Sequence, residues 1–424
     1  MMKTKLVITS VLLGTLLPLS AAEMPKTYVL ASRENAVYKS GEEIEFKVTS
    51  DRETDLQYSV NTGKQDSPRR KLEGKSIRVK AENPGFVLVK LFYQDDVGKQ
   101  KTALAGAAVE PEKIRAGRPR PADFDAYWDN QLAELNRNPL KVVYEKEVQV
   151  PKQPKGIRLY DVKLTQGDIV ATGYLAVPEN AAARSLPAVV SYLGASKVSA
   201  EPPGAWGPAR RIPAICFNLN FHGLQNLPAR NYPKENELRK QLTRDYRTDF
   251  ADQREKYAMR KIYLRTVMAL NYLQSRPEYD GKHLVAQGGS LGGCQAIVAA
   301  ALVPQVTFCV STAAAMCDHF GAEAGHLPGY PDLLRKNPKA AGTAGYFDVV
   351  NFAPRIKCPV VMAVGFIDVT CPPASTYAAY NALTTDKRKM IHQPTCGHGS
   401  SIFPGKANIF SCGAIDYIKH CRGK

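Results

Sequence analysis

The 424-residue sequence is poor in tryptophan, with two in the whole chain, and it has no cysteine before Cys216. Its nine cysteines lack the paired spacing of a zinc site. No hydrophobic run beyond residue 22 reaches the length of a membrane span, and no motif interleaves basic with aromatic residues. These absences exclude a structural zinc fold, a multispanning membrane protein and a nucleic-acid-binding module.

Basic residues outnumber acidic ones, which gives a formal net charge of +17. The lysines and arginines are scattered, a pattern typical of a solvated surface that at most steers the protein toward acidic polysaccharides. With 44% hydrophobic residues the chain can form a large core, and its length suits roughly two domains. The odd number of cysteines leaves at least one thiol unpaired, and a pairing of Cys371 with Cys396 stays open.

Residues 1–22 predict a secretory signal peptide. Lys3 and Lys5 precede an apolar run that ends in Ser20-Ala21-Ala22, so we expect cleavage after Ala22. No cysteine lies near this site, which argues against a lipid anchor. The mature protein is therefore expected to be secreted or periplasmic, without membrane attachment.

Residues 23–110 alternate apolar and polar side chains in short segments separated by turns. Examples are 43–48, 76–80 and 85–93. This spacing predicts a small β-sandwich of immunoglobulin-like type. The segment contains no tryptophan, so a sugar-stacking platform is not evident, and we interpret it as a structural or positioning module.

Residues 111–424 combine strand and helix patterns in the order of an α/β-hydrolase fold. After a Pro-rich linker, Asp123 is expected to cap a helix with one apolar face. Segments 142–150, 157–165 and 169–177 look like antiparallel opening strands, and 186–195 like a strand that runs into a glycine turn. Residues 257–273 repeat apolar side chains at helical spacing.

The stretch Gly288-Gly289-Ser290-Leu291-Gly292 lies between a short apolar strand pattern and an alanine-rich helix pattern. This is the setting of a nucleophile elbow, in which a serine is exposed on a sharp strand-to-helix turn. Glycines at 288 and 292 would leave room for the tight turn. The sequence therefore predicts Ser290 as a nucleophile.

A serine nucleophile needs a base and an orienting acid, which follow in the order Ser, Asp, His in this fold. Asp368 comes after the apolar run 359–365, and His398 lies between two glycines after the last strand pattern. His392 is a competing base, but it falls within the strand pattern. Asp386 and Asp416 are competing acids, which we place on the solvated surface.

The glycine turn after 186–193 is where this fold supplies a second oxyanion donor, the first being the Leu291 N–H. The segment 202–249 mixes prolines, aromatics and charges and is expected to shape the mouth of the site. His222 follows a strand pattern and is a candidate for the substrate pocket.

The sequence resembles the acetyl xylan esterase and cephalosporin C deacetylase family, carbohydrate esterase family seven. The resemblance covers about residues 118–424 and is carried by Phe124-Asp125-Ala126-Tyr127-Trp128, Pro187-Ala188-Val189-Val190, Ser275-Arg276-Pro277-Glu278, Gly288-Gly289-Ser290-Leu291-Gly292-Gly293, the stretch 365–373 with Tyr377-Ala378-Ala379-Tyr380-Asn381, and Gly397-His398-Gly399. It implies that Ser290 is the nucleophile, Asp368 the acid and His398 the base. It also implies that the Ala195 and Leu291 N–H groups form the oxyanion hole.

Two positions depart from the family pattern. Leu291 stands where glutamine is usual, which leaves the backbone donor intact. Phe221-His222-Gly223-Leu224 replaces the usual Arg-Gly-Gln stretch. The second departure and the added N-terminal segment leave open the substrate preference and the ring-shaped homo-oligomer that the resemblance implies.

The sequence as a whole predicts a serine esterase that removes acetyl groups from carbohydrates through an acyl-enzyme, without a metal or cofactor. Two alternatives stay open. One is a serine peptidase of the prolyl oligopeptidase kind, although the β segment is too short for a propeller. The other is a non-catalytic carbohydrate-binding protein with a relic hydrolase domain, against which the complete triad argues.

Overall fold

A computed structural model of the chain describes residues 25–51, 56–229, 231–242, 245–405 and 408–423. The expected signal peptide, residues 1–22, lies outside these ranges. Within them, no helix combines the length and apolar character that crossing a membrane requires.

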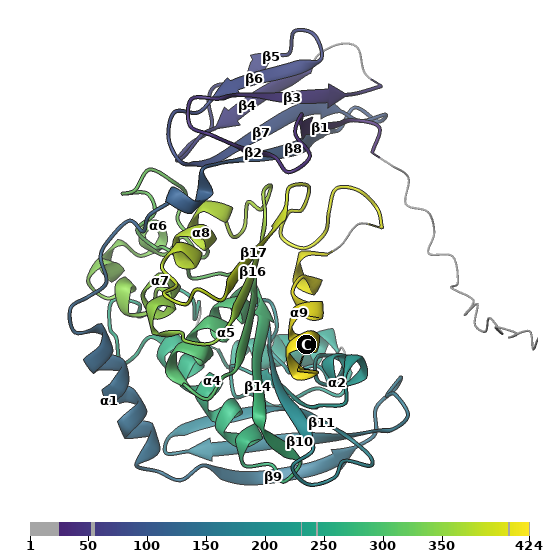
Figure 1. The fold of residues 1–424 in the computed structure, drawn as a ribbon, viewed down its shortest axis with the longest axis vertical. Helices are drawn as coiled ribbons and strands as arrows, with labels where there is room; N and C mark the ends of the chain where they lie inside the picture. The colour runs from purple at the N-terminus through teal and green to yellow at the C-terminus, as the bar shows by residue number, and fades with distance from the viewer. Residues whose placement is uncertain (1–24, 52–55, 230, 243–244, 406–407, 424) are drawn as a thin grey trace, which may run out of the picture.

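The N-terminal part consists of two β-sheets that face each other (Figure 1). One contains β1 (Tyr28–Ala31), β3 (Glu43–Thr49) and β6 (Ser76–Lys80); the other has the order β2 (Val37–Tyr38), β8 (Gln100–Val109), β7 (Gly85–Gln94), β4 (Gln57–Asn61) and β5 (Arg70–Lys71). In β3, Ile44, Phe46 and Val48 are buried, and the residues that alternate with them are exposed or half-buried, as alternation predicts. The immunoglobulin-like class of this part remains a prediction.

The larger part is built on a nine-stranded mixed sheet. Its strand order is β17 (Arg388–Gln393), β16 (Val360–Gly365), β15 (Phe308–Thr312), β14 (Tyr279–Gly289), β12 (Leu186–Tyr192), β13 (Ile215–Asn220), β11 (Ile169–Pro178), β10 (Ile157–Gln166) and β9 (Lys141–Val148). The strands from β17 to β13 are parallel, and β11, β10 and β9 continue the sheet in antiparallel pairs. The predicted α/β-hydrolase sheet is confirmed, including its antiparallel opening strands.

Helices cover both faces of this sheet (Figure 1). One face carries α1 (Phe124–Asn136), α4 (Ala258–Gln274), α5 (Leu291–Leu302), α7 (Val349–Phe352) and α8 (Pro373–Asn381), while the other carries α2 (Pro202–Arg211) and α9 (Ala414–Cys421). The short helices α3 (Tyr232–Lys240) and α6 (Leu333–Lys336) lie in the connections. Successive residues of a strand point to opposite faces of the sheet and so pack into different hydrophobic clusters. Val190 packs with residues of α4 and α5, and Val189 packs with residues of α2 and α9.

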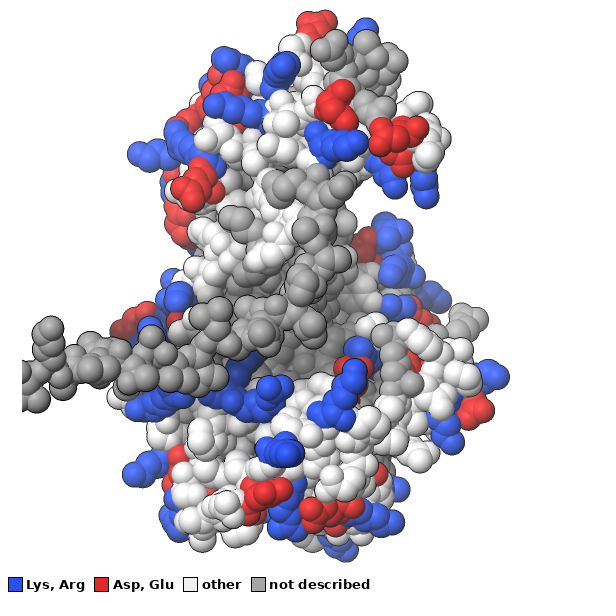
Figure 2. Space-filling view, turned by 90° about the vertical axis from the view of Figure 1, so that its right-hand side faces the viewer, with Lys and Arg blue, Asp and Glu red and all other residues white. Residues whose placement is uncertain are grey.

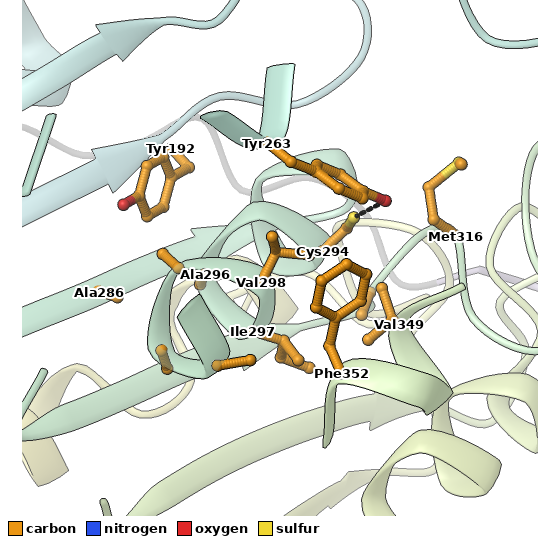
Figure 3. Packing of buried hydrophobic residues seen from close by; sticks show 14 of the residues in the cluster. Tyr192, Tyr263, Ala286, Cys294, Ala296, Ile297, Val298, Met316, Val349 and Phe352 are labelled. Atoms are coloured by element: carbon orange, nitrogen blue, oxygen red, sulfur yellow. Dashed lines mark hydrogen bonds between the residues drawn. The ribbon is translucent and has the colours of Figure 1, made fainter. Parts of the chain in front are cut away.

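The helix behind the elbow, α5, is buried along its whole length. Figure 3 shows how Tyr263 of α4 reaches over it: the Tyr263 hydroxyl lies 3.2 Å from the Cys294 thiol and donates to the Phe347 carbonyl at 2.8 Å. Phe352 of α7 closes the same cluster. This packing fixes the helix whose first turn follows Ser290.

The prediction that the Asp123 side chain caps α1 is wrong. Asp123 does precede the helix, but its carboxylate makes no capping hydrogen bond. It accepts instead from the Tyr346 hydroxyl and pairs with Arg254 at 3.5 Å. The competing partners came from segments more than a hundred residues away, beyond the reach of a local capping rule.

The N-terminal sheets contact the loop that follows β16. The Phe86 ring of β7 packs edge to face on Phe366 with centroids 5.2 Å apart, and also contacts Tyr377 of α8. In β8, a Cβ atom at Gly106 would lie 2.2 Å from the Phe366 carbonyl oxygen. Only glycine permits this approach, so β8 and the loop are in direct backbone contact.

Candidate active site

Ser290 lies at the turn between β14 and α5 with φ 58° and ψ −124°. The glycines around it allow two backbone approaches. A Cβ atom at Gly288 would lie 2.3 Å from the Gly292 oxygen, and one at Gly292 would lie 2.3 Å from the Tyr192 oxygen. The turn therefore folds onto itself and onto β12, as the elbow motif predicts.

The backbone of Ser290 is strained, because a residue with a Cβ atom rarely adopts positive φ. Such a conformation costs about 1–3 kcal/mol and persists only where neighbours hold it. Here the Ser290 N–H donates to Thr312 O at 2.9 Å, while Ser290 O accepts from the N–H groups of Cys294 and Ala315 at 3.1 and 3.0 Å. These bonds present the hydroxyl at the carboxyl edge of the sheet.

The three predicted site residues lie in one chain of hydrogen bonds. His398 Nε2 is 2.9 Å from Ser290 Oγ, and His398 Nδ1 is 2.8 Å from Asp368 Oδ2. A carboxylate can only accept, so Nδ1 carries a proton and Nε2 has a free lone pair toward the serine. This tautomer allows the imidazole to take the hydroxyl proton.

Asp368 is held by backbone donors on its other oxygen. Oδ1 accepts from the N–H groups of Thr370 and Cys371 at 2.8 and 2.9 Å, and the side chain is 1% exposed. Every hydrogen-bond partner of this carboxylate therefore requires it to accept.

The competing residues have other partners. His392 is on β17 as expected, and its Nε2 is bonded to the Tyr377 hydroxyl. Asp416 pairs with Lys389 at 2.7 Å, and Asp386 is exposed in the loop before β17. None of the three belongs to the hydrogen-bond chain at Ser290.

The loop after β12 contains Ala195, whose N–H was predicted to be the second oxyanion donor. Gly194 O accepts from the Lys197 N–H at 3.2 Å, which closes a turn over residues 194–197. In a trans peptide the N–H points opposite to the carbonyl, so the Ala195 N–H points away from Lys197. Among the described residues, neither the Ala195 nor the Leu291 N–H has a hydrogen-bond acceptor. Both remain available to a substrate oxygen.

Three side chains hold the carbonyls of this loop, and the sequence patterns did not reveal them. Gln295 of α5 donates to Leu193 O at 3.1 Å, the Tyr246 hydroxyl donates to Ala195 O at 3.0 Å, and Arg239 of α3 donates to Ser196 O. These contacts join segments up to about a hundred residues apart, so no local motif contains them.

His222 is buried, and it is not among the residues that line the cavity beside Ser290. Its ring packs against Phe221 and against Tyr246, with centroids 4.1 and 4.7 Å away. Burial lowers the pKa of His222 to about 3, helped by the cations Arg265 and Arg239. The neutral ring therefore packs against Tyr246, which holds the loop 193–197, called the oxyanion loop below for its predicted role.

A second nucleophile candidate, Cys371, is buried next to the site. Burial raises the pKa of this thiol well above its ordinary value, and the Asp368 charge adds to the effect. The thiol stays protonated and unpaired, so the pairing with Cys396 that the sequence left open is not formed. Within the described part of the chain, no group of three or more His, Cys, Asp or Glu side chains is arranged to hold a metal ion.

Ser290 and His398 open into a cavity of about 680 Å³. Its walls come from the oxyanion loop, from α2 and from the C-terminal segment, including Phe410. Phe410 is 44% exposed and lies edge to face against the His398 ring, with centroids 5.4 Å apart. Within the segment 202–249, which was predicted to shape the mouth of the site, α2 lines the cavity. Phe410 and Tyr330 also line it, which the sequence did not predict.

Known proteins resemble the chain in sequence and fold. The family described as acetyl xylan esterase (AXE1) matches residues 109–403. Acetyl esterase Axe7A of Xylanibacter ruminicola is 33% identical over 314 residues, which make up 73% of this chain and 70% of that protein.

Two solved structures share the fold. Acetyl xylan esterase from Paenibacillus sp. R4 has a TM-score of 0.58 at 27% identity, covering 69% of this chain and 94% of its own. Acetyl xylan esterase 1 from Thermoanaerobacterium sp. JW/SL YS485 has a TM-score of 0.59 at 23% identity, covering 74% and 98%. The resemblance predicted from the motifs is confirmed: the chain belongs to the acetyl xylan esterase family and is a carboxylic ester hydrolase with an α/β-hydrolase fold.

Proposed function

We propose that the protein is a secreted or periplasmic serine esterase that removes O-acetyl groups from carbohydrates, with Ser290, His398 and Asp368 as its catalytic residues. The hydrogen-bond chain from Asp368 through His398 to Ser290 carries this proposal. Membership of the acetyl xylan esterase family supports acetyl as the acyl group and a carbohydrate as the molecule that carries it.

In the first half-reaction, Ser290 Oγ attacks the acetyl carbonyl carbon while His398 Nε2 takes the hydroxyl proton. The carbonyl oxygen becomes an oxyanion, which the Ala195 and Leu291 N–H groups stabilise. Loss of one such donor typically costs about 2.7–4 kcal/mol. The tetrahedral intermediate then breaks its bond to the sugar oxygen, which takes the proton from His398 and leaves as a hydroxyl, and the acetyl group remains on Ser290.

In the second half-reaction, water attacks the acetyl-enzyme and His398 accepts its proton. The tetrahedral intermediate collapses to release acetate and restores the Ser290 hydroxyl. Asp368 accepts three hydrogen bonds, holds the imidazole in this tautomer and stabilises the imidazolium that forms twice per turnover.

We expect acetyl to be preferred over longer acyl groups. The oxyanion loop lies close to the nucleophile, since a Cβ atom at Gly194 would be 3.9 Å from Ser290 Cβ. Gln295, Tyr246 and Arg239 donate hydrogen bonds to the carbonyls of this loop and so oppose its movement away from Ser290. Aryl acetate should therefore be hydrolysed roughly tenfold or more faster than aryl butyrate, measured as kcat/KM.

A panel of carriers separates the proposed activity from its alternatives. Acetate release is measured from acetyl xylan and from acetylated sialic acid, with a peptide amide as the comparison. Cleavage of the amide without release of acetate from any sugar would favour the serine peptidase. Binding of the sugars without hydrolysis would favour the non-catalytic carbohydrate-binding protein. In its described residues, the N-terminal part forms two sheets and no radial blades of a propeller, which supports the esterase over the peptidase.

We further propose that residues 23–110 form a separate domain that positions the acid loop of a hydrolase domain at 111–424. Phe86 and Gly106 contact Phe366, two residues before Asp368. A shift of this loop would misplace the carboxylate relative to His398.

Phe86→Ala should lower kcat on the order of tenfold, since small misplacements of catalytic groups carry large rate costs. Phe92→Ala is the matched control. Phe92 is also half-buried on the same face of β7, but its ring lies under Arg69, with 3.8 Å between guanidinium and centroid. Phe86→Tyr keeps the ring and should retain activity. Equal kcat values in the Phe86→Ala and Phe92→Ala variants would rule out positioning of the acid loop through Phe86.

A further inference from the structure

The cavity at Ser290 continues as a slot along one face of the sheet, between α2 and α9. Ser191, Gln287 and Val310 form its floor, and these three residues are register partners on adjacent strands. Gly204 and Gly207 of α2 form one wall, and Ala414 of α9 belongs to the other. A Cβ atom at Gly207 would meet nothing within 4 Å, so this wall leaves open space above the floor, whereas Gly204 lets α2 pack closely on Asn218 of β13.

The slot extends well away from the nucleophile. Gln287 precedes Ser290 by three residues, which in a strand is roughly 10 Å. The helix α2 connects parallel strands β12 and β13, so it runs back toward the amino edge of the sheet. Its last residue, Arg211, lines the slot seven residues beyond Gly204, about 10 Å along a helix. Arg211 is therefore remote from Ser290.

Polar groups in the slot lack protein partners. Among the described residues, neither the Ser191 hydroxyl nor the Gln287 amide makes a side-chain hydrogen bond, and both residues are partly exposed. Such groups can exchange hydrogen bonds with hydroxyls of a bound sugar. At 680 Å³ the whole cavity lies within the range of small-molecule sites and exceeds what an acetyl group needs.

The two cations of the slot differ in their partners. Lys197, near the nucleophile, is paired with Glu201 at 2.6 Å. Arg211 is exposed, its guanidinium lies beside the Tyr417 hydroxyl of α9, and it forms no ion pair with a carboxylate of the described residues. Figure 2 views the side of the molecule where α2 and α9 lie and shows blue Lys and Arg side chains, with some red Asp and Glu among them, over its lower half. The far end of the slot is therefore suited to an anion.

We propose that the slot binds an acidic carbohydrate carrier, with a sugar carboxylate paired to Arg211 while the acetylated sugar lies at Ser290. The inference rests on the proposed deacetylase function and names its substrate class as an oligosaccharide bearing uronic acid. A guanidinium binds a carboxylate through two parallel hydrogen bonds, which gives direction as well as affinity. The distance between Arg211 and Ser290 assigns the carboxylate and the acetyl group to different sugar units.

The test compares two forms of one substrate: acetylated xylo-oligosaccharides that carry uronic acid, and the same material with the carboxyl groups reduced to alcohols. For the wild type we expect kcat/KM to be about tenfold higher on the acidic form at low salt, as for a charge-assisted hydrogen bond. Added salt should shrink this ratio. Arg211→Gln should bring the ratio close to one, and Arg211→Lys should retain part of it.

Arg210→Gln is the matched control, because Arg210 is an equally exposed neighbour at the same helix end but does not line the slot. It should keep the wild-type ratio. A wild-type ratio near one, or a ratio unchanged by Arg211→Gln, would overturn the carboxylate site. If neither substrate form nor an aryl acetate releases acetate, the proposed function itself fails.

Discussion

Ser290→Ala is expected to fold like the wild type and to lose ester hydrolysis on the order of 10⁶-fold, as loss of the nucleophile does in other serine hydrolases. Alanine keeps the Cβ atom, so the strained backbone at φ 58° is unchanged, and the Ser290 N–H and carbonyl can still make their three hydrogen bonds. Only the attacking oxygen is removed. Steady-state hydrolysis of an aryl acetate, with thermal unfolding as the fold control, measures both effects.

A serine-reactive phosphonate gives an independent readout. It should label the wild type at Ser290 alone, because this hydroxyl lies 2.9 Å from a histidine that is itself oriented by a carboxylate. Ser275→Ala serves as the matched serine control, since the Ser275 hydroxyl is bonded to Tyr272 O at the end of α4. Label at another residue, or activity retained in Ser290→Ala, would refute the assignment.

Backbone strain at Ser290 supplies a further comparison. Glycine adopts positive φ without a steric penalty, so Ser290→Gly should be as inactive as Ser290→Ala but more stable. The alanine variant should show no such gain. The comparison of the two variants would then separate the stability cost of the strained backbone at Ser290 from the loss of the nucleophile.

The sequence predicted those parts of the fold that depend on local patterns. The elbow, the strand before Asp368 and the helix at 258–274 each follow from apolar periodicity and glycine placement within about twenty residues. The short strands β1, β2 and β5 were missed, because two to four residues carry too little alternation to be recognised. Their pairing is decided by neighbouring strands.

The site was predictable only as far as its residues occur in recognisable motifs. Ser290, Asp368 and His398 lie in glycine-flanked or strand-end positions and were predicted as one site, and the structure places them in one hydrogen-bond chain. The contacts of Phe86 with Phe366 and of Tyr246 with Ala195 were not predicted, because each joins residues far apart along the chain. A phenylalanine in an alternating strand has the same local pattern whether its ring faces solvent or another domain.

Asp368→Asn is expected to lower turnover on the order of 10⁴-fold, the loss seen when a triad imidazole is held in the wrong tautomer. The hydrogen bonds around this residue explain the size of the effect. The Thr370 and Cys371 N–H groups both donate to one oxygen of the side chain. An asparagine must therefore place its carbonyl oxygen there and turn its amide nitrogen toward His398.

An amide nitrogen donates, so His398 Nδ1 must become the acceptor and the ring proton must move to Nε2. Nε2 would then face Ser290 Oγ with a hydrogen in place of its lone pair and could not accept the hydroxyl proton. Measurement of kcat for Asp368→Asn beside Asp386→Asn, which alters an exposed loop carboxylate, tests this assignment. If Asp386→Asn proved the damaging change and Asp368→Asn harmless, the acid would be misassigned. The two N–H donors on Oδ1 would then have a structural role only.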